Sequence, residues 1–286
     1  MKQAGQIYSL KVLRKTDIGY MLTDIENIDI TNEYILHKKQ ATKELVEGEI
    51  VLAFLYYDSQ KRLTATMETP SVTLSQMGWS TVKTINHNIG IFVNININKD
   101  ILISKDLLPQ NKLLWPNEGD KLYIQLKSKS NQIVGKIVGK TLIHDHPFNL
   151  NVNDTVECYI SRIMDEGLSC YTEDLNVIFI HKTQYRDNKY RLGQKLEVKI
   201  IKENMNREYS GSLILRKESQ MDNDSLIILE YLKANNGKMR FGNDSLPEDI
   251  FKVFNMSKKA FKRALGHLYK ERKINFIDNY TILVKE

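Results

Sequence analysis

The chain has 286 residues, of which 42% are hydrophobic and 27% are charged, so it holds enough apolar material for more than one folded core. Its formal charge of +6 favours anionic partners without identifying one. No apolar run approaches the roughly 18–20 residues that span a bilayer, and no apolar leader follows Met1, so we expect a cytoplasmic protein without a membrane partner. The two cysteines, Cys158 and Cys170, form no disulfide framework and agree with a reducing compartment.

Three landmarks recur in the same order along the first two thirds of the chain. A glycine with an apolar residue after it comes first, an apolar–polar–lysine triplet second, and a glycine that opens a new strand third. The landmark residues, unit by unit, are Gly19, Lys38 and Gly48; Gly90, Lys105 and Gly119; Gly167, Lys182 and Gly193. The recurrence indicates three related units, and the variable insertions between landmarks exclude a solenoid.

Each unit carries short runs of β-branched and aromatic residues with partial alternation, which predict strands. The clearest runs are 50–57, 122–126 and 196–201, and a polar hairpin-type segment follows each of them. About five short strands in roughly 65 residues is typical of a small barrel.

The sequence therefore predicts a mainly β chain with a C-terminal α+β domain. Polar segments predict joints at Pro70, near Pro147 and over 217–224. The expected domains are OB-like barrels at 1–70, 71–145 and 150–215 and a winged-helix domain at 222–286.

From Ser225 the hydrophobic period becomes helical. A first helix ends near Asn235, the capping-box spacing from Ser245 to Glu248 predicts the start of a second, and Ser257 can cap a third. The residues expected to face inward are Ile250, Phe251, Val253 and Phe254 on the second helix and Phe261, Ala264, Leu265 and Leu268 on the third.

Two short strands follow, at 274–276 and 280–284, joined through Asp278 and Asn279. Three helices and a β-hairpin form the order of a winged helix, in which the third helix is offered to a nucleic-acid groove.

Two motifs make the chain similar to a known family. One runs from Val253 to Lys258 (VFNMSK) and continues from Phe261 to Lys270 (FKRALGHLYK), and the other is Leu114-Trp115-Pro116 leading to Gly119. With the order of the repeats, these motifs resemble the conserved virulence factor B family of bacterial RNA-binding regulators. The resemblance implies S1-type OB-folds, a C-terminal winged helix, RNA binding, and regulation of gene expression at the RNA level, including that of virulence factors.

The S1 pattern has an aromatic residue before the first glycine, another two residues after it, and a histidine near the lysine. The residues before the glycine are Ile18, Ile89 and Glu166, and those two after it are Met21, Phe92 and Ser169. Of these six residues, only Phe92 matches an S1 aromatic position, and it could stack on a base or pack in the barrel. His37 and His181 match the S1 histidine, and each could have a structural role in a turn or contact RNA. Because the platforms are largely missing, we expect RNA binding to be distributed and electrostatic.

The candidate RNA contacts on the barrels are Phe92, His37, His181, Lys38, Lys105, Lys182, Lys195 and Lys199. The candidates on the third helix are Lys258, Lys259, Lys262, Arg263 and Lys270. Residues 257–273 hold seven Lys or Arg and one acid, which favours nucleic-acid contact over a merely solvated face or a protein contact.

No phosphate loop, zinc-protease motif or serine-hydrolase elbow occurs in the sequence. His144-Asp145-His146 is interpreted as a surface joint, because a metal site needs further ligands. We therefore expect no catalysis, no cofactor and no metal, and single-stranded RNA as the partner. Two alternatives stay open: a transcription regulator that reads duplex DNA with its winged helix, and a ribonuclease or its accessory protein.

Overall fold

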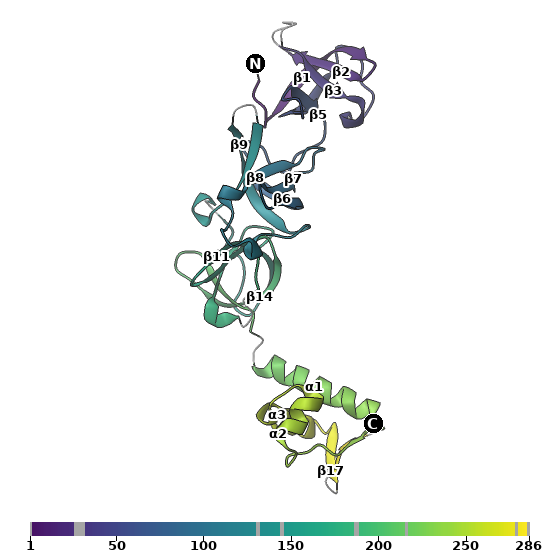
Figure 1. The fold of residues 1–286 in the computed structure, drawn as a ribbon, viewed down its shortest axis with the longest axis vertical. Helices are drawn as coiled ribbons and strands as arrows, with labels where there is room; N and C mark the ends of the chain where they lie inside the picture. The colour runs from purple at the N-terminus through teal and green to yellow at the C-terminus, as the bar shows by residue number, and fades with distance from the viewer. Residues whose placement is uncertain are drawn as a thin grey trace. The chain divides into compact units, whose positions relative to one another are not determined.

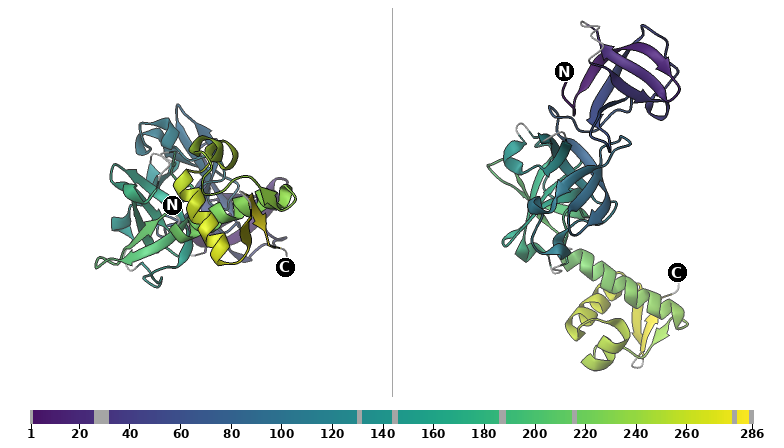
Figure 2. Two further views of the ribbon diagram at one scale, coloured as in Figure 1. Left: turned by 90° about the horizontal axis from the view of Figure 1, so that it is seen from below. Right: turned by 45° about the horizontal axis from the view of Figure 1, so that its top comes forward.

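The computed structural model describes residues 2–25, 32–129, 132–143, 146–185, 189–214, 217–277 and 280–284. The chain divides into two compact units, Met1–Leu213 and Ile214–Glu286. Over the described residues, the first unit contains three closed five-stranded barrels, and the second contains three helices and a three-stranded sheet (Figures 1 and 2). The predicted fold class, three OB-like barrels followed by a winged helix, is confirmed.

All three barrels have one topology. The strands of the first barrel are β1 (Ile7–Thr16), β2 (Gly19–Asp24), β3 (Tyr34–His37), β4 (Ile50–Tyr57) and β5 (Leu63–Thr66). Those of the second are β6 (Gly78–Asn86), β7 (Gly90–Asn94), β8 (Ile101–Ser104), β9 (Lys121–Lys129) and β10 (Gln132–Ile137). Those of the third are β11 (Thr155–Met164), β12 (Gly167–Tyr171), β13 (Val177–His181), β14 (Lys195–Glu203) and β15 (Tyr209–Ser212). In each barrel the third and fifth strands pair in parallel and the other neighbours are antiparallel.

The first glycine and the lysine of each set of landmarks meet at one corner of the barrel, and the second glycine lies beside the bulge of the first strand. In the third barrel, a Cβ on Gly167 would lie 2.1 Å from the carbonyl oxygen of Ile180, so no side chain fits where β12 crosses β13. The Lys182 N–H donates to the carbonyl of Glu166 over 2.8 Å, which places the lysine backbone beside this glycine. Gly193 has a φ of 72°, a left-handed conformation that favours glycine. The close approach at the corner explains the first recurring glycine, and the left-handed φ explains the second.

The other two barrels repeat these contacts. The Lys38 and Lys105 N–H groups donate to the carbonyls of Ile18 and Ile89 over 3.1 and 2.9 Å. A Cβ on Gly19 or Gly90 would lie 2.0 or 2.1 Å from a carbonyl oxygen of the third strand. The backbone of each landmark lysine thus belongs to the corner, whereas its side chain is exposed to solvent.

Contacts between neighbouring barrels hold the first unit together. The Arg191 guanidinium bridges to the buried Asp120 carboxylate with N–O distances of 2.7 and 3.1 Å, which joins the third barrel to the second. The Trp79 indole N–H also donates to the Glu173 carbonyl over 2.9 Å. Between the first two barrels, the Asn98 N–H donates to the Glu68 carboxylate over 2.6 Å.

The second unit is a winged helix with its own apolar core. Its elements are α1 (Lys217–Ala234), β16 (Lys238–Met239), α2 (Pro247–Phe254), α3 (Lys258–Lys270), β17 (Ile274–Ile277) and β18 (Tyr280–Leu283). The buried face of α3 is the predicted one, formed by Phe261, Ala264, Leu265 and Leu268. The Ser257 hydroxyl caps α3 by accepting the Ala260 N–H over 3.2 Å, also as predicted.

Three expectations for this region were wrong. Segment 217–224 is the first part of α1 rather than a joint; it contains no glycine or proline, and its Lys, Glu, Gln and Met residues are good helix formers. Ser245 does not cap α2, because its hydroxyl accepts the Gly242 N–H over 2.9 Å and Leu246 occupies the cap position. Phe251 and Val253 face outward, since the two-turn α2 buries only Ile250 and Phe254.

Other expectations concern cysteines, the wing turn and the membrane. Cys158 and Cys170 are free thiols buried in the third barrel. Asp278 and Asn279 of the expected wing turn lie outside the described residues. No helix in the described part of the chain is long and apolar enough to cross a bilayer.

Candidate nucleic-acid interface

An outward-facing row of three residues crosses the first three strands of each barrel. The residues lie opposite one another in the strand pairing, with the residue two after the landmark glycine in the middle. The rows are Arg14, Met21 and Ile35; Thr84, Phe92 and Leu102; Arg162, Ser169 and Phe179. This row is therefore the structural equivalent of the S1 aromatic position in all three barrels.

The third barrel places its row in a cleft of about 920 Å³. Arg162 and Phe179 line this cleft from the barrel, and Lys136 and Lys140 line it from the end of the second barrel. Lys140 is paired with Glu208 over 2.7 Å, whereas Lys136 and Arg162 take part in no ion pair within the described ranges. The cleft thus combines an aromatic ring with two unpaired cations.

Phe179 was not among the predicted site residues, because the S1 pattern was matched only around the landmark glycine. Ser169 occupies the usual aromatic position on β12, but Phe179 lies directly opposite it on β13 and is half-buried. Its ring centroid is 6.4 Å from that of His181, two residues later on the same strand. The alternation of Val177-Ile178-Phe179-Ile180-His181 would have placed Phe179 on the same face as the candidate His181. An aromatic platform is therefore present in the third barrel, shifted by one strand.

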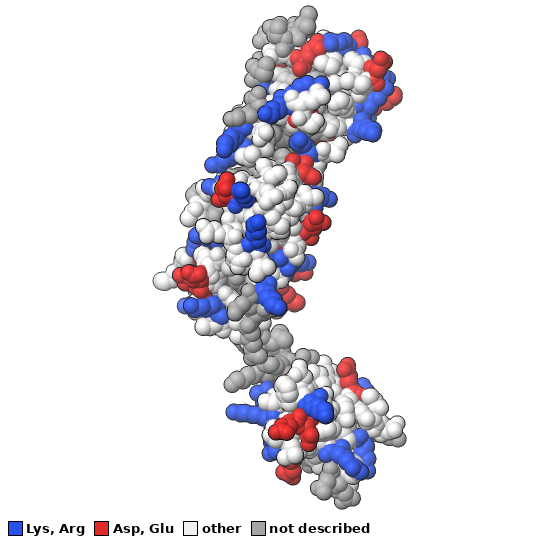
Figure 3. Space-filling view, in the orientation of Figure 1, with Lys and Arg blue, Asp and Glu red and all other residues white. Residues whose placement is uncertain are grey.

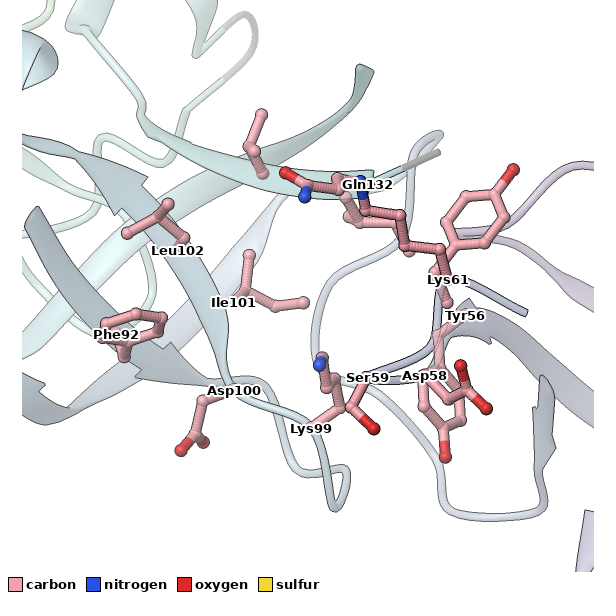
Figure 4. Close-up of a pocket in the computed structure, with 13 residues that line it drawn as sticks. Tyr56, Asp58, Ser59, Lys61, Phe92, Lys99, Asp100, Ile101, Leu102 and Gln132 are labelled. Carbon is pink, nitrogen blue, oxygen red and sulfur yellow. The ribbon is translucent and has the colours of Figure 1, made fainter. Parts of the chain in front are cut away.

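Phe92 lies on the outward face of β7 and is half-buried, so it is not part of the barrel core. It lines a groove of about 240 Å³ together with residues of the hairpin between β4 and β5 (Figure 4). The second barrel thus presents its aromatic residue to a space that the first barrel helps to enclose.

The two histidines have different surroundings. The His181 side chain accepts the Thr183 N–H through Nδ1 over 3.3 Å and caps the short turn η5 (Lys182–Gln184). His37 makes no such cap and, with Lys38, lines a shallow hollow of about 390 Å³ that also contains Asn98. A turn role is therefore observed for His181 only.

The barrel lysines do not gather at one place. The side chains of Lys105 and Lys182 are exposed at the landmark corners. Lys195 is paired with Glu157 over 2.6 Å, and the hydrogen bond to this carboxylate raises the pKa of the Lys195 ammonium. Lys195 and Lys199 lie on β14, which neighbours β11 and β15 and not the strands that carry Phe179 and Ser169. Figure 3 shows basic side chains dispersed among acidic ones on the visible face.

Helix α3 has an exposed basic face. Lys259, Lys262 and Lys270 are exposed and Lys258 is half-buried. Arg263 differs from them, because its guanidinium lies 3.7 Å from the Asp224 carboxylate of α1. Arg263 thus connects two helices of the winged helix and is less available to an external ligand than the lysines.

An aromatic pair lies beside this basic face. Tyr269 on α3 is 53% exposed, and its ring centroid is 5.4 Å from that of Phe276 on β17. The described residues contain no cluster of three or more His, Cys, Asp or Glu side chains that could hold a metal ion. His144 and Asp145 lie outside the described residues.

Comparisons with known families agree with this architecture. The profile of the CvfB-like winged helix domain matches residues 227–283, and that of the CvfB first S1-like domain matches residues 77–136, the second barrel. The S1 domain profile matches residues 4–68, the first barrel. S1 and winged-helix domains are nucleic-acid-binding types.

Individual proteins match over most of the chain. The uncharacterized protein YitL of Bacillus subtilis strain 168 is 34% identical over 274 residues, which cover 94% of this chain and 90% of YitL. Conserved virulence factor B of Staphylococcus aureus strain N315 is 31% identical over 249 residues, covering 85% and 82% of the two chains.

A solved structure is similar as well. The crystal structure of a multidomain protein with nucleic acid binding domains from Streptococcus pneumoniae TIGR4 superposes with a TM-score of 0.63 at 30% identity, covering 98% of each chain. These matches, together with the three barrels and the winged helix, show that the chain belongs to the conserved virulence factor B family.

Proposed function

We propose that the protein is a non-catalytic binder of single-stranded RNA that regulates gene expression at the RNA level. The observation that carries the proposal is the cleft of the third barrel, where Phe179, Arg162 and Lys136 face one space. An aromatic ring stacks on an unpaired base for about 1–3 kcal/mol, and cations bind the backbone phosphates. Bases are available for such stacking in single strands and not in a duplex.

The polar lining of the same cleft favours RNA over DNA. The Ser161 hydroxyl and the Glu166 carboxylate both line it, and both can accept a hydrogen bond from a ribose 2′-hydroxyl. Regulation at the RNA level is supported by the resemblance to the family.

The composition of α3 argues against sequence-specific reading of duplex DNA. Major-groove readers use Arg on guanine and Asn or Gln on adenine. The outward face of α3 carries lysines, Gly266 and Tyr269, and the one arginine of the helix is paired with Asp224. Such a face binds phosphates and carries little base-edge information, so we place duplex DNA second to RNA.

Competitive filter binding with single-stranded RNA, single-stranded DNA and duplex DNA tests the proposal. We expect single-stranded RNA to bind most tightly and Phe179→Ala to weaken it about tenfold. Phe251→Ala removes an exposed aromatic side chain of α2 and serves as the control, with no expected loss. Equal affinity for duplex DNA, or an unaffected Phe179→Ala variant, would contradict the RNA site.

Absence of catalysis is tested separately by incubating labelled RNA with magnesium and purified protein. We expect the RNA to stay at full length, because the sequence has no nuclease carboxylate set. Magnesium-dependent shortening that a single carboxylate substitution abolishes would show that the protein is a nuclease.

A further inference from the structure

Strand β4 of the first barrel carries a stripe of apolar side chains on its outward face. The outward positions alternate with core residues and are Ile50, Leu52, Phe54 and Tyr56. Phe54 and Tyr56 are buried in an apolar cluster that they share with residues of the second barrel, such as Ile97. Ile50 and Leu52, in contrast, are 58% and 66% exposed. The second barrel therefore covers one half of the stripe and leaves the other half bare.

The bare half of the stripe extends onto the neighbouring strand β1. In the pairing of β1 with β4, Ile7 lies opposite Phe54, and Ser9 lies opposite Leu52. Side chains at opposite positions of an antiparallel pair lie on the same face of the sheet. Ile7 is 40% exposed. Ile7, Ile50 and Leu52 thus occupy neighbouring positions around the small side chain of Ser9, on a surface that we call the apolar β4 face.

The equivalent strand of the third barrel is charged. Ile50 and Leu52 lie two and four residues after the glycine that opens β4. The residues at these positions in the third barrel are Lys195 and Glu197, and both are exposed. One barrel topology therefore accepts either kind of residue at these positions, so the barrel fold does not require the apolar pair of the first barrel.

In the second barrel, a neighbouring barrel covers the same positions. The residues there are Lys121 and Tyr123, and Trp79 on β6 lies opposite Tyr123. The ring centroid of Trp79 is 5.1 Å from that of Tyr159 in the third barrel, and Lys121 Nζ lies 2.9 Å from the Glu173 carboxylate of that barrel. This face of the barrel is therefore one on which another barrel docks within the same chain.

We propose that the apolar β4 face binds the same face of a second copy of this chain, so that two first barrels pack about a two-fold axis. The face continues the interface that buries Phe54 and Tyr56, and its equivalent in the second barrel is already covered by a barrel. Its exposed members are aliphatic, so it matches an apolar surface and not a phosphate backbone. The equivalent faces of the other two barrels are covered or charged, which leaves the first barrel of another copy as the apolar match. Homodimers most often use one patch twice in this way.

The apolar β4 face is small, so we expect a weak and reversible dimer. Interfaces at the low end of the size range belong mostly to transient complexes. We expect half of the chains to be paired at a concentration on the order of 10–100 μM. Sedimentation equilibrium of the full chain without RNA, from about 5 to 500 μM, should show the mass rising from 33.3 kDa toward twice that value.

The variant Ile50→Lys/Leu52→Glu gives the first barrel the residues that the third barrel carries at the same positions. We expect this variant to stay at 33.3 kDa over the whole concentration range, because its face is charged and hydrated. Both positions are exposed, so the variant should keep the fold, which circular dichroism checks. Leu113→Lys/Met205→Glu is the matched control: it replaces two strongly exposed apolar residues outside the face and should associate as the wild type does.

A thiol introduced by Ser9→Cys locates the contact without the charged variant. Ser9 lies opposite Leu52, so a short bismaleimide should link two copies of Ser9→Cys and not two wild-type chains, whose Cys158 and Cys170 are buried. A wild-type chain that stays monomeric up to about 500 μM, or a dimer that Ile50→Lys/Leu52→Glu leaves intact, overturns the proposal. If the chain is monomeric and that variant instead weakens single-stranded RNA binding, the face belongs to the RNA site and the dimer is refuted.

Discussion

The first and third barrels share a topology but differ in what they place on the outward row. Arg14 and Arg162 occupy equivalent positions after the bulge of the first strand. Arg14 is held by Glu33 through two N–O contacts of 2.6 Å, and its row continues with Met21 and Ile35. Arg162 has no acidic partner in the described part of the chain, and its row ends in an aromatic ring.

This difference shows how one fold position serves two purposes. An arginine paired to a carboxylate has its hydrogen-bonding donors occupied and its charge offset, whereas an unpaired arginine in a cleft remains available to phosphate. The glycine corners are shared by the barrels, whereas the surrounding side chains differ, and under the proposed function these side chains decide which barrel binds RNA. Equivalent mutations in the two barrels therefore distinguish residues that maintain the barrel fold from residues that contact RNA.

Replacing the corner glycine should have the largest effect of the changes predicted here, and it should destabilise both barrels. Gly19→Ala and Gly167→Ala each place a Cβ about 2 Å from a backbone carbonyl oxygen. We expect each to cost about 3 kcal/mol or more of local stability, since a backbone contact cannot relax as a side chain does. Hydrogen exchange of peptides from each barrel measures the effect.

Gly266→Ala is the control for this pair. Gly266 lies within α3, and a Cβ added there would meet open space, so alanine should stabilise the helix by about 0.5–1 kcal/mol. If Gly167→Ala left the stability of the third barrel unchanged, the close approach at the corner would not be required for the barrel fold.

Removing the basic face of α3 tests whether the barrels bind RNA alone. In the variant Lys258→Ala/Lys259→Ala/Lys262→Ala, Arg263 is kept because it pairs with Asp224. If each lysine contacts one phosphate, the log–log salt slope should fall by about 2, at about 0.7 per phosphate on a single strand. We expect a loss of affinity of about thirtyfold at about 0.2 M salt and a larger loss at lower salt, whatever the RNA sequence. An unchanged slope would confine RNA binding to the first unit.

The two equivalent arginines give the sharpest comparison of the barrels. Arg162→Ala should weaken single-stranded RNA binding about tenfold, because it removes a charged hydrogen-bond donor from the cleft. Arg14→Ala should leave RNA affinity unchanged, because that guanidinium is already paired with Glu33. RNA affinity measured for both variants at one salt concentration shows whether the two arginines differ in their contribution to binding. Equal losses would mean that the two rows bind alike.

Much of the fold could be predicted from the sequence, because it depends on patterns among nearby residues. The recurrence of the glycines, the buried face of α3 and the Ser257 cap depend on residues close together in the chain or on a repeated spacing. The role of Ser245 did not follow, since its hydroxyl had two backbone partners within reach and took Gly242.

The site was harder to predict, because it depends on contacts across strands and between barrels. Phe179 replaces an aromatic residue that is missing ten positions earlier, and only the pairing of β12 with β13 brings the two positions together. The groove beside Phe92 needs a hairpin from another barrel. Arg14 and Glu33 are 19 residues apart, and the sequence pattern of neither segment predicts that they form an ion pair.

The smallest expected effect concerns pH and the first barrel. The hydrogen bond from Arg14 lowers the pKa of the Glu33 carboxyl from its ordinary value of 4.5. Because the folded-state pKa lies below the unfolded one, the ion pair stabilises the barrel above pH 4.5, and this contribution is lost as the pH falls through the lowered pKa. The pair is near the surface, so the change should be small and should weaken further with salt. Urea titrations at pH 7 and pH 3.5, followed by NMR signals assigned to each barrel, measure it. Glu33→Gln removes the titrating group, so the first barrel of that variant should lose less stability on acidification than the wild type, with the third barrel unchanged. An identical acid response in both proteins would mean that the Arg14–Glu33 pair contributes nothing to the stability of the first barrel.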